Sequence, residues 1–138
     1  MTQFILISIF FLIYEFGILL NPKKIINLKK KLDEVRNLEG EQKTKMSKEI
    51  ISSGLSLILF NLFYFSWSIT GLIIYQHWYL FFFIIFLSFF SSFITKQILF
   101  LDKPIFYYKI FETILSIIVL SLILISFFYP NLYNNLIF

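Results

Sequence analysis

The chain has 138 residues, of which 59% are hydrophobic and 22% aromatic, and its formal net charge is +4. It has no cysteine, which excludes disulfides, thiolate catalysis and cysteine metal sites, and its one histidine cannot form a metal site alone. A soluble domain of this length has too little interior to bury twenty phenylalanines. We therefore predict one all-α integral membrane domain over residues 1–138, without cofactor, metal or catalytic activity. The alanine-free composition is also typical of an AT-rich genome.

Four apolar stretches are suited to transmembrane helices, at about residues 4–20, 51–75, 80–95 and 107–129. The hydrocarbon layer holds no water, so backbone groups must be satisfied internally and the spans must be helices. The first stretch has neither a positive region before it nor a small-residue cleavage site, which predicts an uncleaved first helix. The turn around His77 contains Trp78 and Tyr79, which favour a membrane interface. We expect His77 to be an ordinary interfacial residue, because a pH sensor would need a partner.

Residues 22–49 form the only long hydrophilic segment, and its apolar residues recur at helical spacing: Ile25, Leu28, Leu32 and Val35. This pattern predicts an amphipathic helix that begins at Pro22 and ends near Gly40. The helix would lie on the membrane surface or on a partner, although it could also be a plain connector between two spans. The cations expected to contact anionic lipid or a partner protein are Lys23, Lys24, Lys29, Lys30, Lys31 and Arg36.

The cations are distributed very unevenly along the chain. All twelve lysines and arginines lie between Lys23 and Lys109. Four spans place these positions on one side of the bilayer and both termini on the other. By the positive-inside rule, the basic side is cytoplasmic, or faces the matrix in an organelle. We therefore expect a bacterial inner membrane or an organellar inner membrane protein whose termini face outward.

Two carboxylates lie inside predicted spans. Glu15 and Glu112 are each five residues from the cytoplasmic end of a span, or roughly 7–8 Å along the helix. Buried charge is costly, so an ionisable residue in the membrane indicates a functional site with a partner. Lys109 shares a helical face with Glu112, and desolvation should turn Glu15 toward the bundle interior. The alternatives are snorkelling to the headgroups, a simple Lys109–Glu112 pair, and serines that only mediate packing. The predicted intramembrane polar cluster comprises Glu15, Ser88, Ser92, Lys109, Glu112 and Ser116.

A second set of small and polar residues shares one face of the second span. Asn61 lies near the membrane midplane, where an unsatisfied amide is expensive, so it should hydrogen-bond to another helix. Small and hydroxylated residues allow transmembrane helices to approach closely. We therefore predict a helix-packing face, with ion coordination as the alternative, made of Gly54, Asn61, Tyr64, Ser68 and Gly71.

These patterns favour a non-catalytic accessory or assembly subunit of a larger membrane complex. Its expected partners are the lipid bilayer and either other membrane subunits or further copies of the same chain. Membrane topology accounts for the positive charge, so nucleic acid is not an expected partner. One alternative is a small homo-oligomeric channel or an ion-coupled carrier that uses Glu15 and Glu112. Another is a holin-like pore former or a membrane immunity protein.

Overall fold

The computed structural model describes residues 2–38 and 40–137, apart from the side chains of residues 42, 43, 46, 49 and 51–53. The described residues form helices joined by short turns. The helices are α1 (Thr2–Leu20), α2 (Pro22–Asn37), α3 (Glu41–Ile74), α4 (Trp78–Ile98), α5 (Asp102–Phe128) and α6 (Pro130–Ile137).

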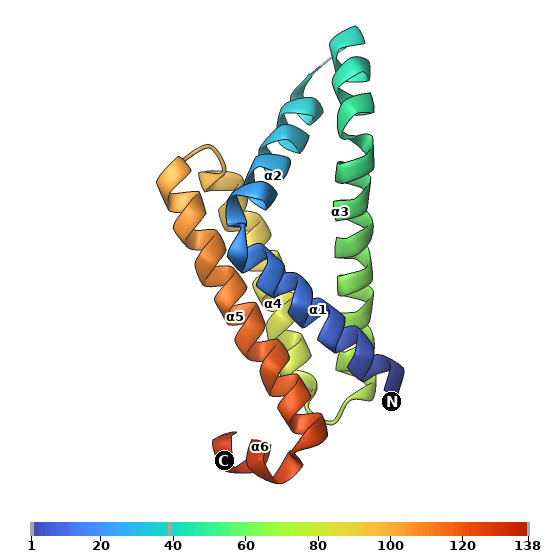
Figure 1. Cartoon of the computed structure of the whole chain (residues 1–138), viewed down its shortest axis with the longest axis vertical. Coiled ribbons are helices and arrows are strands. Elements are labelled where there is room, and N and C mark those ends of the chain that lie inside the picture. Colours follow the sequence, from blue (N-terminus) through green and yellow to red (C-terminus); the bar gives the residue numbers. More distant parts are fainter. Residues whose placement is uncertain (1, 39, 138) are drawn as a thin grey trace.

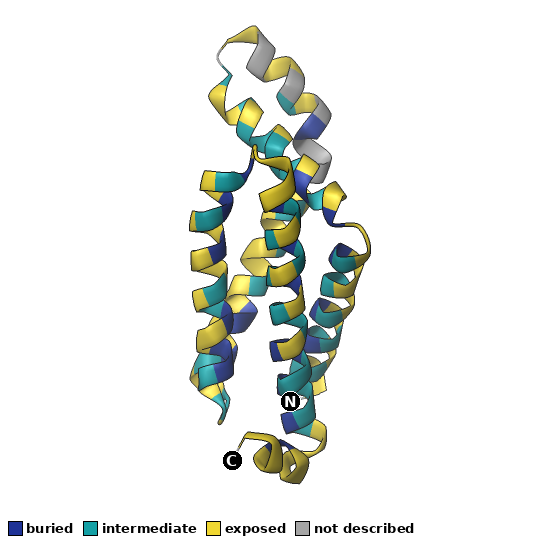
Figure 2. Ribbon diagram, turned by 90° about the vertical axis from the view of Figure 1, so that its left-hand side faces the viewer, coloured by how far each residue is buried: buried dark blue, intermediate teal, exposed yellow. Residues whose placement is uncertain are grey.

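The prediction of an all-helical fold with four apolar helices is confirmed for the described residues. The described residues contain four segments that are long and apolar enough to cross a bilayer, namely Thr2–Leu20, Gly54–Ile74, Trp78–Ile98 and Asp102–Phe128. Exposed residues occur along all of these helices (Figure 2), and many are large and apolar, such as Phe86 and Phe93. This combination is consistent with a helical membrane protein, because a soluble bundle would hide such side chains.

The long helices pack as a bundle in which α1 lies against α5, α5 against α4, and α4 against α3. Both chain ends and the α3–α4 turn lie at one end of the molecule (Figure 1), which we call the terminal end. The α4–α5 turn, α2 and the start of α3 lie toward the opposite end, which we call the basic end. Helix α2 contacts α1, α3 and α5, so the predicted surface helix is packed onto the bundle.

Several helices extend past the apolar stretches from which we predicted them. Helix α3 begins at Glu41, and α5 begins at Asp102 rather than near residue 107. Glu, Gln and Lys are good helix formers, so a helix continues where hydropathy falls. The uncharged residues after the last predicted span are also helical: they form α6, whose Tyr133 is fully buried.

The largest core lies in the terminal half of the bundle and is mostly aromatic. Phe11 on α1 and Phe81 on α4 are fully buried, and Trp67 on α3 is nearly so. The Phe11 ring lies edge-on to Tyr64, with 4.6 Å between centroids, and the Trp67 and Phe81 centroids are 5.2 Å apart. Such edge-to-face pairs are a favoured geometry for aromatic rings. The rings therefore fill the space between α1, α3 and α4.

A glycine lets α3 and α4 approach closely next to this core. A Cβ built on Gly71 would come within 3.0 Å of the Phe81 ring, so a larger residue could not be placed there without displacing the ring. Gly54, where the apolar part of the same helix begins, lies under Leu32 of α2. These two glycines thus leave room for the close contacts of α3 with α4 and with α2.

Candidate functional site

A group of charged side chains lies inside the bundle near the basic end. Lys109 Nζ donates a hydrogen bond to Glu112 Oε2 at 2.8 Å, and both side chains are largely buried, being 10% and 16% exposed. Ser91 Oγ on α4 donates to the other carboxylate oxygen of Glu112 at 2.5 Å. Thr113 Oγ1 donates to the Lys109 carbonyl, which ties the same turn of α5 together. The pair is therefore held by contacts from two helices.

Two further charges come within electrostatic range of this pair. Glu15 on α1 interacts with Lys109, Glu112 and Lys29, and Lys29 on α2 interacts with the other three. Burial, and to a lesser extent the positive charge of Lys109, lower the pKa of Lys29 to about 8 against the opposing effect of the two carboxylates. We call Glu15, Lys29, Lys109 and Glu112 the charged cluster. Its two acids and two bases balance formally, so the group can be buried without a net charge.

The structure brings together part of the polar cluster predicted from the sequence. It places Glu15 near Lys109 and Glu112 and leaves Ser116 half-buried on α5. Ser91 is the serine of α4 that contacts Glu112, whereas Ser88 and Ser92 are exposed. Lys29, which we had assigned to lipid or partner contact, lies at the cluster.

Ser88 and Ser92 instead line a groove on the outer surface between α3 and α4. The groove has a volume of about 330 Å³, and Asn61 reaches it from α3. All three polar residues are exposed. Ser88 is ten residues from each end of the apolar helix Trp78–Ile98, roughly 15 Å from either end. We call this the α3–α4 groove; it is lined by Ile58, Asn61, Leu62, Phe65, Ser88, Phe89 and Ser92.

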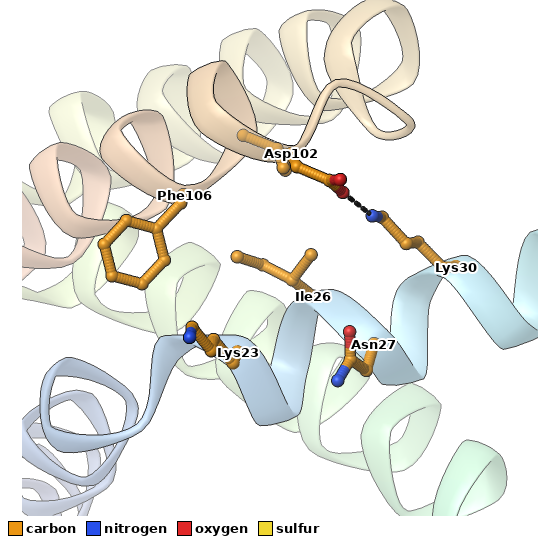
Figure 3. Close-up of a pocket in the computed structure, with 7 residues that line it drawn as sticks. Lys23, Ile26, Asn27, Lys30, Asp102 and Phe106 are labelled. Atoms are coloured by element: carbon orange, nitrogen blue, oxygen red, sulfur yellow. Dashed lines mark hydrogen bonds and ion pairs between the residues drawn. The ribbon is translucent and has the colours of Figure 1, made fainter.

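A second cavity, of about 270 Å³, lies between α2 and the start of α5 (Figure 3). The Lys30 ammonium reaches across it to pair with Asp102 at 2.8 Å. The Lys23 ammonium lies 6.0 Å from the centroid of the Phe106 ring. We call this the α2–α5 pocket; it is lined by Lys23, Ile26, Asn27, Lys30, Asp102, Ile105 and Phe106. Of the other cations assigned to lipid or partner contact, Lys24, Lys31 and Arg36 are exposed outside the pocket.

The predicted helix-packing face of α3 meets several different surroundings. Gly54 contacts α2, and Gly71 contacts the Phe81 ring. Tyr64 packs against the aromatic core, and the buried Ser68 hydroxyl donates to the Tyr64 carbonyl at 2.9 Å. Asn61 is the exception, because it is exposed in the α3–α4 groove.

His77 has partners that the sequence did not reveal. The centroid of its ring lies 4.5 Å from the centroid of the Tyr133 ring on α6, and the Tyr79 hydroxyl is 3.2 Å from His77 Nδ1. The hydroxyls of Tyr79 and Tyr133 also hydrogen-bond to each other. Burial raises the pKa of Tyr133, with a smaller increase from the bond to Tyr79, so this phenol stays protonated. These contacts dock α6 on the α3–α4 turn.

Comparison of the chain with protein-family models, with curated proteins and with solved structures found no match.

Proposed function

We propose that this chain is a non-catalytic accessory subunit of a membrane complex, and that its α3–α4 groove receives a transmembrane helix of another subunit. One observation carries the proposal: the Asn61 amide and the Ser88 and Ser92 hydroxyls are exposed on the outside of two apolar helices. Lipid tails offer these groups no hydrogen-bond partner.

The energetics favour a protein occupant over lipid. An amide without a partner costs about 4–8 kcal/mol on transfer from water to a hydrocarbon that cannot hydrogen-bond. A hydrogen bond between transmembrane helices recovers about 0.6–2 kcal/mol of association free energy. The occupant should carry small residues, which allow close approach to the groove, and a polar side chain at the depth of Asn61.

The proposed orientation follows from charge. In the bilayer, the basic end would face the cytoplasm or the matrix, and both termini would lie on the other side. Helix α2 would then run at the headgroup level, with Lys24, Lys31 and Arg36 toward anionic lipid or a soluble partner.

The charged cluster favours a second candidate, an ion-coupled carrier or channel. Carboxylates within a bundle are typical of proton relays, and Glu15 and Glu112 lie near each other. Neither the α3–α4 groove nor the α2–α5 pocket is lined by these two residues, however. The formal charge balance also accounts for the cluster as a structural element. For these reasons the accessory role ranks first.

The test places a photo-crosslinking amino acid at Ser88 in the groove, or at the exposed Phe111 of α5 as a matched control. We expect Ser88 to crosslink to one different subunit that co-purifies in a fixed ratio, and Phe111 to give lipid adducts. Asn61→Leu should weaken this association about fivefold, the equivalent of about 1 kcal/mol. Equal crosslinking from both positions would contradict the proposal. A product containing only copies of this chain would favour the homo-oligomeric channel.

A further inference from the structure

The α2–α5 pocket combines cations with an apolar floor. Lys23, Asn27 and Lys30 are spaced at i, i+4 and i+7, so they lie on one face of α2, and this face looks toward α5. Figure 3 shows Lys23 and Lys30 on α2, with Phe106 and Asp102 opposite them on α5. The floor comprises Ile26 and Ile105, which are 5% and 2% exposed.

The charges leave a cation available for an anion. Lys30 is committed to Asp102 at 2.8 Å. Lys23 only lies over the Phe106 ring, at 6.0 Å, which is the outer limit of a cation–π contact. Two lysines against one aspartate give the pocket a formal charge of +1. The Asn27 amide adds hydrogen-bond donors next to these charges.

The pocket also lies where an apolar helix ends. Asp102 begins α5, and α2 follows directly after the apolar helix α1. In a chain that crosses the bilayer, this level is that of the lipid phosphates. A ligand with an anionic head and an apolar body would satisfy both the lysines and the floor, whereas a free anion would leave the floor uncovered.

We propose that the α2–α5 pocket is a binding site for an anionic phospholipid. Lys23 and Asn27 hold the headgroup phosphate, and the upper part of an acyl chain lies against Phe106 and Ile105. Basic pockets between helices at a membrane surface are typical sites for such headgroups. This site does not depend on the α3–α4 groove, so it can exist whether or not the chain is an accessory subunit.

The test is native mass spectrometry of the full chain in mild detergent, titrated with phosphatidylglycerol. Phosphatidylcholine, soluble glycerophosphoglycerol and inorganic phosphate serve as comparison ligands. Lys23→Gln should weaken phosphatidylglycerol binding about fivefold, since a cation near anionic lipid is worth about that factor. The matched control is Lys24→Gln, which removes the same charge one residue away, outside the pocket, and should have little effect. Asp102→Asn should strengthen binding, because it releases Lys30.

Several results would overturn the proposal. Equal weakening by Lys23→Gln and Lys24→Gln would indicate diffuse surface attraction rather than a site. Binding of phosphatidylcholine as tightly as phosphatidylglycerol would exclude recognition of the anionic headgroup. Competition by inorganic phosphate or by glycerophosphoglycerol at similar affinity would identify a free-anion site in place of a lipid site. The opposite effects expected for the Lys23 and Asp102 variants also separate recognition from damage to the fold, which would lower binding in both.

Discussion

The buried pair between Lys109 and Glu112 allows a quantitative test of the charged cluster. The changes are Glu112→Gln and Lys109→Met, made singly and together. Removing one partner of a buried ion pair typically costs about 3–5 kcal/mol, because the other charge stays desolvated. Each single variant leaves an unbalanced charge in the cluster. After Glu112→Gln, Lys29 and Lys109 face only Glu15, and after Lys109→Met, Glu15 and Glu112 face only Lys29. We therefore expect the cost of both variants to fall within this range.

The double variant should cost clearly less than the sum of the two single variants. It removes one acid and one base, so Glu15 and Lys29 remain as a balanced pair. We expect a coupling free energy of at least about 2 kcal/mol, within the range for residues in direct contact. A coupling of this size would show that the pair is desolvated in the membrane-embedded protein.

The assay is reversible unfolding of the purified chain in mixed detergent micelles with increasing sodium dodecyl sulfate. Emission from Trp67, which is 4% exposed, reports the state of the core if Trp78 is replaced by phenylalanine. Lys24→Met is the matched control, because it removes an exposed lysine. Additive single effects, each no larger than that of the control, would refute the reasoning and would mean that both side chains reach water or headgroups.

Three other predictions concern pH, packing and orientation. The pKa of Lys29 is lowered from 10.5 in the unfolded chain to about 8 in the folded chain, so the unfolded chain binds more protons between these pH values. The free energy of unfolding should therefore rise from about pH 8 to about pH 10.5, and Lys29→Met should flatten this rise in unfolding curves. Gly71→Ala should destabilise the chain by about 1–3 kcal/mol in the same assay, whereas Gly17→Ala should change stability by less than about 1 kcal/mol, because there is open space around Gly17. Equal effects of the two variants would argue against close packing at Gly71. A cysteine at Gly40 should be protected from an impermeant thiol reagent in intact cells and one at Asn135 labelled, and the reverse pattern would invert the orientation.

Hydropathy was sufficient to predict the four apolar helices, because a membrane span is a local property of composition. It could not locate the helix ends, since helix formation does not require apolar residues. Helix α3 therefore begins at Glu41, inside a segment predicted as part of a hydrophilic loop. Helix α6 was missed for a different reason: its apolar residues do recur at helical spacing, but the segment is too short to be assigned as a helix from the sequence alone. The burial of Tyr133 depends on Tyr79 and His77 across the turn.

The sequence predicted the pairing within one helix more specifically than the contacts between helices. The Lys109–Glu112 pair follows from i, i+3 spacing, and the structure contains it. The approach of Lys29 depends on how α2 turns back after Asn21, which no periodicity records. The buried face of α2 was likewise not predicted by the apolar stripe. Its members are half-buried, while the most buried apolar residue is Ile26, which packs against Leu99 and Ile105. Helix α2 has neighbours on two sides, so its buried surface is broader than one stripe.

The polar groups of the bundle fall into two kinds, and the difference bears on function. Glu112 is satisfied within the chain, because Lys109 and Ser91 both donate to it. Asn61 also lies in an apolar helix, but it is exposed, in the α3–α4 groove. A polar group satisfied inside costs the monomer little, whereas one exposed to lipid penalises every state except the assembled one. In the proposed complex, the outward amide of Asn61 would make the isolated subunit less stable in lipid than the assembly. A carrier that works as a single chain would gain nothing from this penalty, whereas it would help to hold the proposed accessory subunit on its partner.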